Sequence, residues 1–203
     1  MLLIAGIGMP ISMNHLVDKA YNEDFSYSKR LTVSDYELVD KTYDGQWVQI
    51  SQAHFSKDDG YNRLLTVISQ GNFVNATTSK GEAIKEGGLY VTNGFAEAAN
   101  IKVGDKMKVI PYHDGKEYTF KVKGIVTSEI NQGAYIMSST FEKAGGAFKP
   151  STLLVGDNVS SRQLSNDSNI QSVIKKNNQE RNAYDFVNSL MSVFLMIIGF
   201  ALL

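Results

Sequence analysis

The apolar residues of this 203-residue chain gather at its two ends. The chain opens with MLLIAGIGMPISM and closes with VNSLMSVFLMIIGFALL, whereas the sequence between these segments is polar and rich in Ser, Asn, Lys, Asp and Gly. A helix that crosses a bilayer needs about 20 apolar residues, so residues 1–13 alone are too short to span one. We therefore expect both segments to belong to membrane helices that continue beyond the given sequence, with a water-exposed domain between them.

The C-terminal segment carries the strongest helix signal. Asn178–Leu203 contains no proline, and only Gly199 interrupts a run of good helix formers. Such a helix would be about 39 Å long at a rise of about 1.5 Å per residue. Asn177 and Glu180 have the spacing of a capping box at its start. From Leu190 onward the helix would be apolar on all sides, which is typical of a helix in a large core or in lipid, and we favour lipid.

The N-terminal segment has the pattern of the outer end of a membrane helix. It has neither the Lys- and Arg-rich start nor the small-residue cleavage site of a signal peptide. Apolar residues continue at helical spacing through Met13, Val17 and Ala20. In this part of the segment, polar residues lie between the apolar ones. This pattern predicts a helix that leaves the membrane as an amphipathic stalk and is kinked near Pro10. The alternative is a buried N-terminal helix of a soluble domain.

Short strand patterns separated by turn signals fill the polar middle of the chain. Within 25–40, Leu31 and Val33 and then Tyr36 and Leu38 have strand character. Residues 81–87 favour a short helix, and 157–169, rich in Ser, Asn and Asp, are expected to form a loop. The further segments with strand character are 47–55, 63–74, 89–91, 134–139, 152–156 and, as strand or helix, 172–176.

The stretch Gly87–Thr127 predicts a strand, a short helix, a glycine turn and a β-hairpin, in this order. Thr92 or Asn93 would cap the helix, because its side-chain oxygen accepts from the unpaired N–H groups of the first turn. Gly104-Asp105 follows as the turn. Three apolar residues of the helix are expected on one face: Phe95, Ala98 and Ala99.

The hairpin within this stretch turns at Asp114-Gly115, a strong hairpin signal, with His113 beside it. Tyr118, Phe120 and Val122 alternate with polar residues, which is the pattern of a half-buried strand. Strands and short helices in this mixture predict an α+β fold with mixed or antiparallel sheets, between two partial transmembrane helices.

The composition of the chain and the spacing of its reactive residues argue against a catalytic, metal-binding or cofactor-binding function. It contains no cysteine, which excludes disulfides, cysteine zinc ligands and thiol catalysis, and its net charge of -1 does not favour nucleic-acid binding. His15, His54 and His113 lie far apart, without the spacing of a metal site. The sequence contains no nucleophile elbow and no phosphate-binding glycine loop. We expect no catalytic, cofactor-binding or metal-ligating residues and no cofactor.

In the order of its elements, the chain resembles the extracytoplasmic domain of FtsX-like and MacB-like ABC transporter permeases. The segments that carry the resemblance are IAGIGMPISM, LYVTNGFAEAANIKVGDKMKVI, YTFKVKGIV, AYIMS and SLMSVFLMIIGFALL. In that family an apolar strand, a small "FA" helix, a "GD" turn and a strand ending in V-x-G-I recur between two membrane helices. One departure is the segment after Gly156, which is short and lacks a long crossover helix for the second half of the usual outer domain.

The resemblance implies a permease subunit in the cell membrane, with its main domain outside the cytoplasm. It also implies a separate cytoplasmic ATP-binding subunit as partner, and a homodimer or a permease pair. The ATP chemistry would then lie on the other polypeptide, so no family catalytic residue is carried over to this chain. Peptide, antibiotic or lipoprotein export is the kind of task implied, with no nucleic-acid partner.

The expected organisation has three parts. Residues 1–24 form the end of a transmembrane helix and a stalk, 25–176 the extracytoplasmic α/β domain, and 177–203 a second stalk and the start of the next transmembrane helix. Two alternatives remain open at this point. One is a ligand-sensing domain of a membrane receptor or kinase, which is also inserted between two membrane helices. The other is a soluble enzyme with apolar terminal helices.

Overall fold

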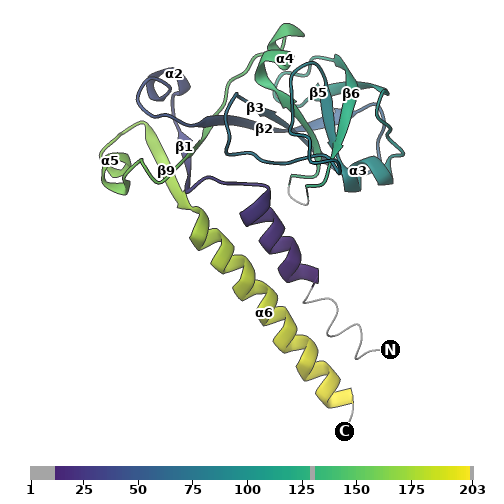
Figure 1. Cartoon of the computed structure of the whole chain (residues 1–203), viewed down its shortest axis with the longest axis vertical. Coiled ribbons are helices and arrows are strands. Elements are labelled where there is room, and N and C mark those ends of the chain that lie inside the picture. Colours follow the sequence, from purple (N-terminus) through teal and green to yellow (C-terminus); the bar gives the residue numbers. More distant parts are fainter. Residues whose placement is uncertain (1–11, 129–130, 202–203) are drawn as a thin grey trace.

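In the computed structural model, which describes residues 12–128 and 131–201, a sheet domain carries a pair of long helical segments that project from one side (Figure 1). The fold is α+β, with a mixed sheet and short helices, and this confirms the predicted α+β class and sheet type. The N-terminal apolar segment lies almost wholly outside the described residues, as does the predicted kink at Pro10.

The strands of the described chain form one sheet. Their bounds are β1 Lys29–Val33, β2 Gln46–Phe55, β3 Arg63–Ile68, β4 Leu89–Thr92, β5 Lys106–Pro111, β6 Tyr118–Val126, β7 Gly133–Met137, β8 Thr152–Val155 and β9 Ile170–Lys175. The helices are α2 Tyr36–Val39, α3 Asn93–Ala98, α4 Ser138–Lys143, α5 Ser161–Ser165 and α6 Lys176–Ala201. A π-helical turn, η1 Lys19–Glu23, continues the helical residues 12–18.

The sheet closes on itself through its longest strand, β2. The strand order is β3-β7-β4-β6-β5-β2-β8-β1-β9, and β3 also pairs with β2, so that six strands form a ring. β3 with β7 and β4 with β6 are parallel, and the other pairs are antiparallel. The start of β2 leaves the ring and pairs with β8, which continues the sheet as an extension to β1 and β9.

Apolar side chains from every strand of the ring form one core cluster. The stretch Gly87–Thr127 supplies much of it, including the fully buried Val91, Phe95 and Val122. The alternation predicted for β6 is confirmed, since its burial pattern is strictly alternating up to Val122. A second cluster lies under the extension around Trp47, and a third contains Tyr27, Tyr135 and Leu154. The stretch is therefore a large part of the ring and its core.

The predicted strand character of Tyr36 and Leu38 is wrong, because these residues form the short helix α2. Asp35 explains the difference. Its carboxylate accepts hydrogen bonds from the backbone N–H groups of Glu37 and Leu38 at 2.9 and 3.4 Å. These N-cap hydrogen bonds stabilise a helical turn, so the residues do not pair as a strand.

Helix α3 exists as predicted, but its cap and its buried face differ. Thr92 occupies the N-cap position without a capping bond, because its hydroxyl donates to Gln132 Oε1 at 2.9 Å and accepts from the Gly133 N–H at 3.1 Å. Phe95 and Ala96 are buried, whereas Ala98 is exposed. The helix is too short for a full amphipathic period, so the sheet contact alone selects its buried face.

The segments near the C-terminus also depart from the predictions. Residues 81–87 form no helix, and the expected loop 157–169 contains α5, which begins with a capping box of Ser160 and Gln163. Helix α6 starts at Lys176, directly after β9, so Asn177 lies inside the first turn and does not cap it. The ladder ends where the Lys176 N–H donates to the Ser28 carbonyl at 2.9 Å, and the helix follows at once.

Gly133 is the glycine on which the β3–β7 pairing depends most. Its φ is +150°, and an added Cβ would collide with the backbone of Leu64, its partner in β3. We expect Gly133→Ala to lower the free energy of unfolding in urea by about 3 kcal/mol or more, because backbone strain and a backbone collision combine. Gly104→Ala is the matched control, with φ +98° and nothing within 4 Å of the added Cβ, and should cost only about 1 kcal/mol. Equal losses would contradict this account of Gly133.

Candidate functional site: the helical stalk and its junction with the sheet

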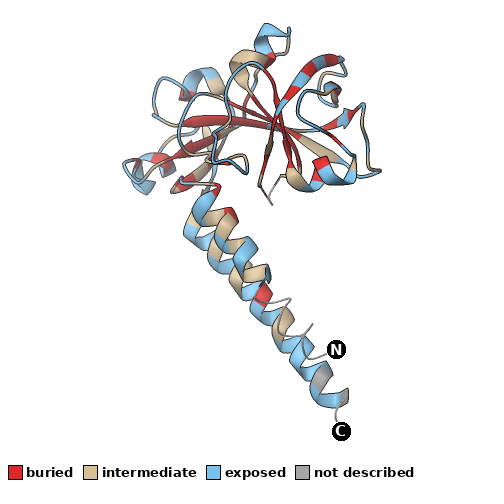
Figure 2. Cartoon of the chain, turned by 45° about the vertical axis from the view of Figure 1, so that its right-hand side comes forward, coloured by how far each residue is buried: buried red, intermediate tan, exposed pale blue. Residues whose placement is uncertain are grey.

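The feature that most distinguishes this molecule is its stalk, defined here as helical residues 12–23 together with α6. The two segments run antiparallel and side by side, and both leave the same side of the sheet domain (Figures 1 and 2). α6 continues β9 without a connecting residue. β9 is held in turn by its ladder with β1, in which Lys29 pairs with Lys175 and Arg30 with Ile174. Movement of α6 would therefore act directly on the sheet.

A single ammonium group ties the two stalk segments together where they meet the sheet. Lys176 Nζ donates to the Tyr21 carbonyl at 2.8 Å and to the Phe25 carbonyl at 3.3 Å. The Tyr21 carbonyl belongs to η1 and the Phe25 carbonyl to the chain just after it, so Lys176 connects the start of α6 to the end of the N-terminal helix. Charge-assisted bonds to carbonyl oxygens are stronger than neutral ones, and this favours one fixed angle between the segments.

One turn further along the stalk, polar side chains bridge the helices. Asn22 Nδ2 donates to Glu180 Oε1 at 3.0 Å and to Asp18 Oδ1 at 2.7 Å. Tyr184 lies close to the same two carboxylates. Burial raises the pKa of Tyr184, and the negative charges of Asp18 and Glu180 raise it further. Tyr184 therefore stays neutral well above physiological pH, and this contact is not a pH switch near neutrality.

The N-terminal segment is also connected to the ring. The π-helical turn η1 widens the helix so that the Asp24 N–H donates to the Lys19 carbonyl at 2.9 Å. Lys19 Nζ contacts both the Asp24 carboxylate, at 3.1 Å, and the Thr127 carbonyl just after β6. π-helical turns are frequent at functional sites. The stalk thus connects both to the extension, through β9 and β1, and to the ring, through Lys19.

The far end of α6 exposes large apolar side chains around its whole circumference. Its exposed apolar residues are Val193, Phe194, Leu195, Met196, Ile197 and Phe200. Helices with this character are normally covered by protein or lipid. Across the residues that the structure describes, no helix has the combination of length and hydropathy that a membrane crossing requires.

The histidines considered in the sequence lie in three separate places. His15 is exposed on the stalk, and His54 is exposed on β2 with its Nδ1 3.8 Å from Asp58. His113 sits in the β5–β6 turn as predicted, with its Nε2 3.2 Å from the Gln49 amide nitrogen. Over residues 12–128 and 131–201, no three His, Asp or Glu side chains gather as metal ligands would.

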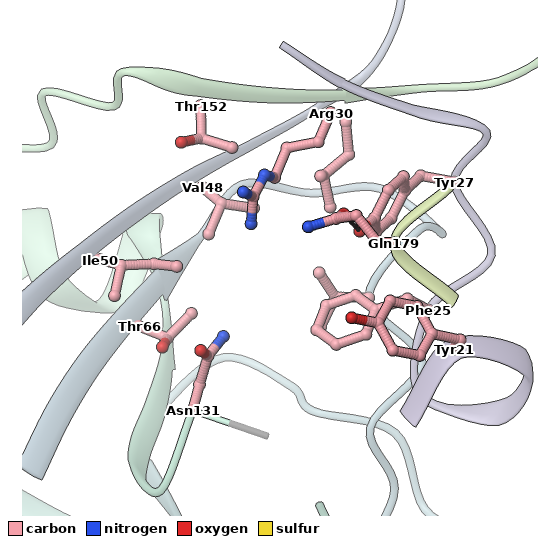
Figure 3. Close-up of a pocket in the computed structure, with 12 residues that line it drawn as sticks. Tyr21, Phe25, Tyr27, Arg30, Val48, Ile50, Thr66, Asn131, Thr152 and Gln179 are labelled. Carbon is pink, nitrogen blue, oxygen red and sulfur yellow. Dashed lines mark hydrogen bonds between the residues drawn. The ribbon is translucent and has the colours of Figure 1, made fainter. Parts of the chain in front are cut away.

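A pocket that the sequence did not predict lies at the junction (Figure 3). It has a volume of about 90 Å³, and we call it the junction pocket. The stalk contributes Tyr21 and Gln179, and the sheet contributes Arg30, Val48 and Thr66. The remaining lining residues are Phe25, Tyr27, Ile50, Val74, Asn131, Thr152 and Leu154. They come from distant parts of the chain, so no local motif signals the pocket.

No family model matches the chain, and no curated protein matches it. Among solved structures, the chain is similar to the periplasmic region of MacB from Actinobacillus actinomycetemcomitans, with a TM-score of 0.42 and 12% sequence identity. The match covers 83% of this chain and 97% of that chain.

Lys176 gives a direct test of the junction. We expect Lys176→Met to speed amide hydrogen exchange in residues 19–28 several-fold and to lower the free energy of unfolding by about 1–2 kcal/mol, because two carbonyl acceptors lose their donor. Lys175→Met is the matched control, because Lys175 is exposed and has no side-chain partner in the described part of the chain. It should change stability by no more than about 0.5 kcal/mol. Similar exchange in both variants would show that the ammonium does not fix the junction.

Proposed function

We propose that this chain is the extracytoplasmic domain of an ABC transporter permease subunit, and that its stalk carries motion between the membrane and the sheet domain. In this proposal a cytoplasmic ATP-binding subunit supplies the energy, and two permease subunits work as a pair. The chain moves or exports peptide, antibiotic or lipoprotein substrates and performs no covalent chemistry itself.

The observation that carries the proposal is the apolar end of α6. Large apolar side chains surround the helix there, in the part of α6 that lies farthest from the sheet domain (Figure 2). Exposing this much apolar surface is unfavourable by about 25 cal/mol per Å², so a covering medium is expected. A lipid bilayer covers all sides of a helix at once, whereas a protein groove covers mainly one face.

The connections of the stalk support a mechanical role. The two stalk segments leave the same side of the domain and are bridged by Lys176 and Asn22. One segment continues into β9, and the other contacts the end of β6 through Lys19. Because interfaces of this kind repack between discrete arrangements, a shift of the helices in the membrane would reorient the extension relative to the ring.

The ABC permease class rests on the order of elements that the sequence shares with that family. The strand LYV, the small helix with Phe95, the turn at Gly104 and the strand ending in V-K-G-I are all present as β4, α3, the 104–105 turn and β6. These elements form part of the ring and of its core. The two stalk segments lie at the positions in the chain where the family has membrane helices.

Membrane association can be tested with one exposed residue of α6. Met196 and Val103 have nearly equal exposed fractions, 62% and 60%, but Val103 lies on the sheet domain. We expect Met196→Lys to reduce binding of the chain to phosphatidylcholine vesicles by about a hundredfold, since a lysine within a bilayer costs roughly 2.5–3.5 kcal/mol. Val103→Lys should leave vesicle binding unchanged. Equal effects of the two substitutions, or no binding by the unmodified chain, would contradict lipid contact by α6.

The location and the partner can be tested together in the host cell, because the chain contains no cysteine. Val103→Cys should react with a membrane-impermeant maleimide in intact cells, since an extracytoplasmic domain is accessible from outside. The same protein, purified from membranes in mild detergent, should bring with it an ATP-hydrolysing subunit. Labelling only after lysis would refute the location. Autophosphorylation in place of ATP turnover would favour a receptor kinase.

A further inference from the structure

The junction pocket contains a positive charge without a partner. Arg30 lies on β1, its guanidinium extends into the pocket, and it makes no hydrogen bond or ion pair with any described residue (Figure 3). A guanidinium offers five N–H donors and stays charged at all ordinary pH values. Of the described residues that line the pocket, none is acidic. Among the residues that the structure describes, none in the pocket walls neutralises the charge of Arg30.

Gln179 adds a second donor on the opposite wall. Its Oε1 accepts from the Tyr27 hydroxyl at 3.2 Å, so the amide nitrogen is turned towards Arg30 (Figure 3). Burial raises the pKa of Tyr27, and the positive charge of Arg30 opposes part of this shift. Two groups that can only donate thus face each other across the pocket, and an acceptor placed between them would satisfy both.

Thr66, on β3, also lines the junction pocket. Thr66 is 1% exposed, and its Oγ1 has no hydrogen-bond partner among the residues described. A buried polar group left unpaired costs about 1–3 kcal/mol, and such groups are rare in folded proteins. This oxygen is closed off from the pocket interior, so Thr66 lines the pocket with apolar surface, and a ligand there would not reach its hydroxyl.

The remaining walls are apolar and aromatic. Phe25, Val48, Ile50, Val74 and Leu154 line the pocket, and its volume of about 90 Å³ corresponds to about six to nine water-sized probes. This space suits a short apolar group with one polar end, and it is too small for a lipid or a folded peptide. Charge and shape together specify an anion with a small hydrocarbon part.

We propose that the junction pocket binds the carboxylate of a small apolar organic acid. Arg30 and the Gln179 amide donate to the carboxylate oxygens, and the apolar walls hold the hydrocarbon part. Because Arg30 belongs to the sheet and Gln179 to α6, the bound acid bridges the stalk and the domain and stabilises the junction. Binding of the acid does not depend on the transport function proposed above.

The test is ligand-observed NMR on the full 203-residue chain with butyrate as the probe. Butyrate should give a saturable signal, and butyramide, which has similar shape and no charge, should bind at least about tenfold more weakly, because charge-assisted bonds contribute at least about 1.4 kcal/mol. Inorganic phosphate, which has charge without an apolar part, should also bind more weakly than butyrate. Absence of saturable butyrate binding, or equal binding of butyramide, would overturn the proposal.

Variants identify the site. Arg30→Met keeps an apolar stem and removes the charge, so it should weaken butyrate binding by about tenfold or more. Gln179→Glu gives Arg30 an internal carboxylate and should have a similar effect even if Arg30→Met folds poorly. The matched control Arg162→Met, in the exposed helix α5, should bind butyrate normally. Unchanged binding in Gln179→Glu, with its fold verified by circular dichroism, would place the acid elsewhere and overturn this site.

Discussion

The structure depends on β2, because this strand takes part in three ladders at once. Its residues pair with β3 through Val48–Ala53, with β5 at Ala53–Phe55 and with β8 at Gln46–Val48. The first two ladders close the ring, and the third attaches the extension. A strand of ten residues is long enough to take part in both the ring and the extension. Its two ends contribute to different clusters, with Phe55 in the ring core and Trp47 under the extension.

This arrangement attaches the stalk to both the extension and the ring. α6 follows β9, which pairs with β1 and through it with β8 and β2. The N-terminal segment continues into β1 and also contacts the ring through Lys19 and the Thr127 carbonyl. Backbone ladders are stiff, whereas side-chain contacts such as those of Lys19 and Lys176 can exchange more readily. The junction is therefore the place where a relative movement of the stalk would meet the least resistance, and the junction pocket lies at that place.

The predictions that held were those with a strong local cause. The hairpin at Asp114-Gly115 and the alternation along β6 follow from turn chemistry and from a strand half-buried on one side. The predictions that failed rested on weak local signals, and competing hydrogen bonds decided the structure at α2 and at the start of α3. The Asp35 carboxylate converted a short apolar pattern into α2, and Gln132 and Gly133 occupied the Thr92 hydroxyl that was expected to cap α3. The Asp35 cap is local to the sequence, whereas the contacts of Thr92 cannot be evaluated before β7 is placed beside β4.

The sequence by itself determined the α+β class, most strand positions and the long helix with its apolar end, because these depend on periodicity and composition within short windows. Only the tertiary structure decided how β2 closes the ring and which surfaces meet at the junction. Arg30 and Gln179 illustrate the reason. Each is an ordinary polar residue in its own segment, and they become opposing walls of one pocket only after the β1–β9 ladder has brought α6 beside the sheet.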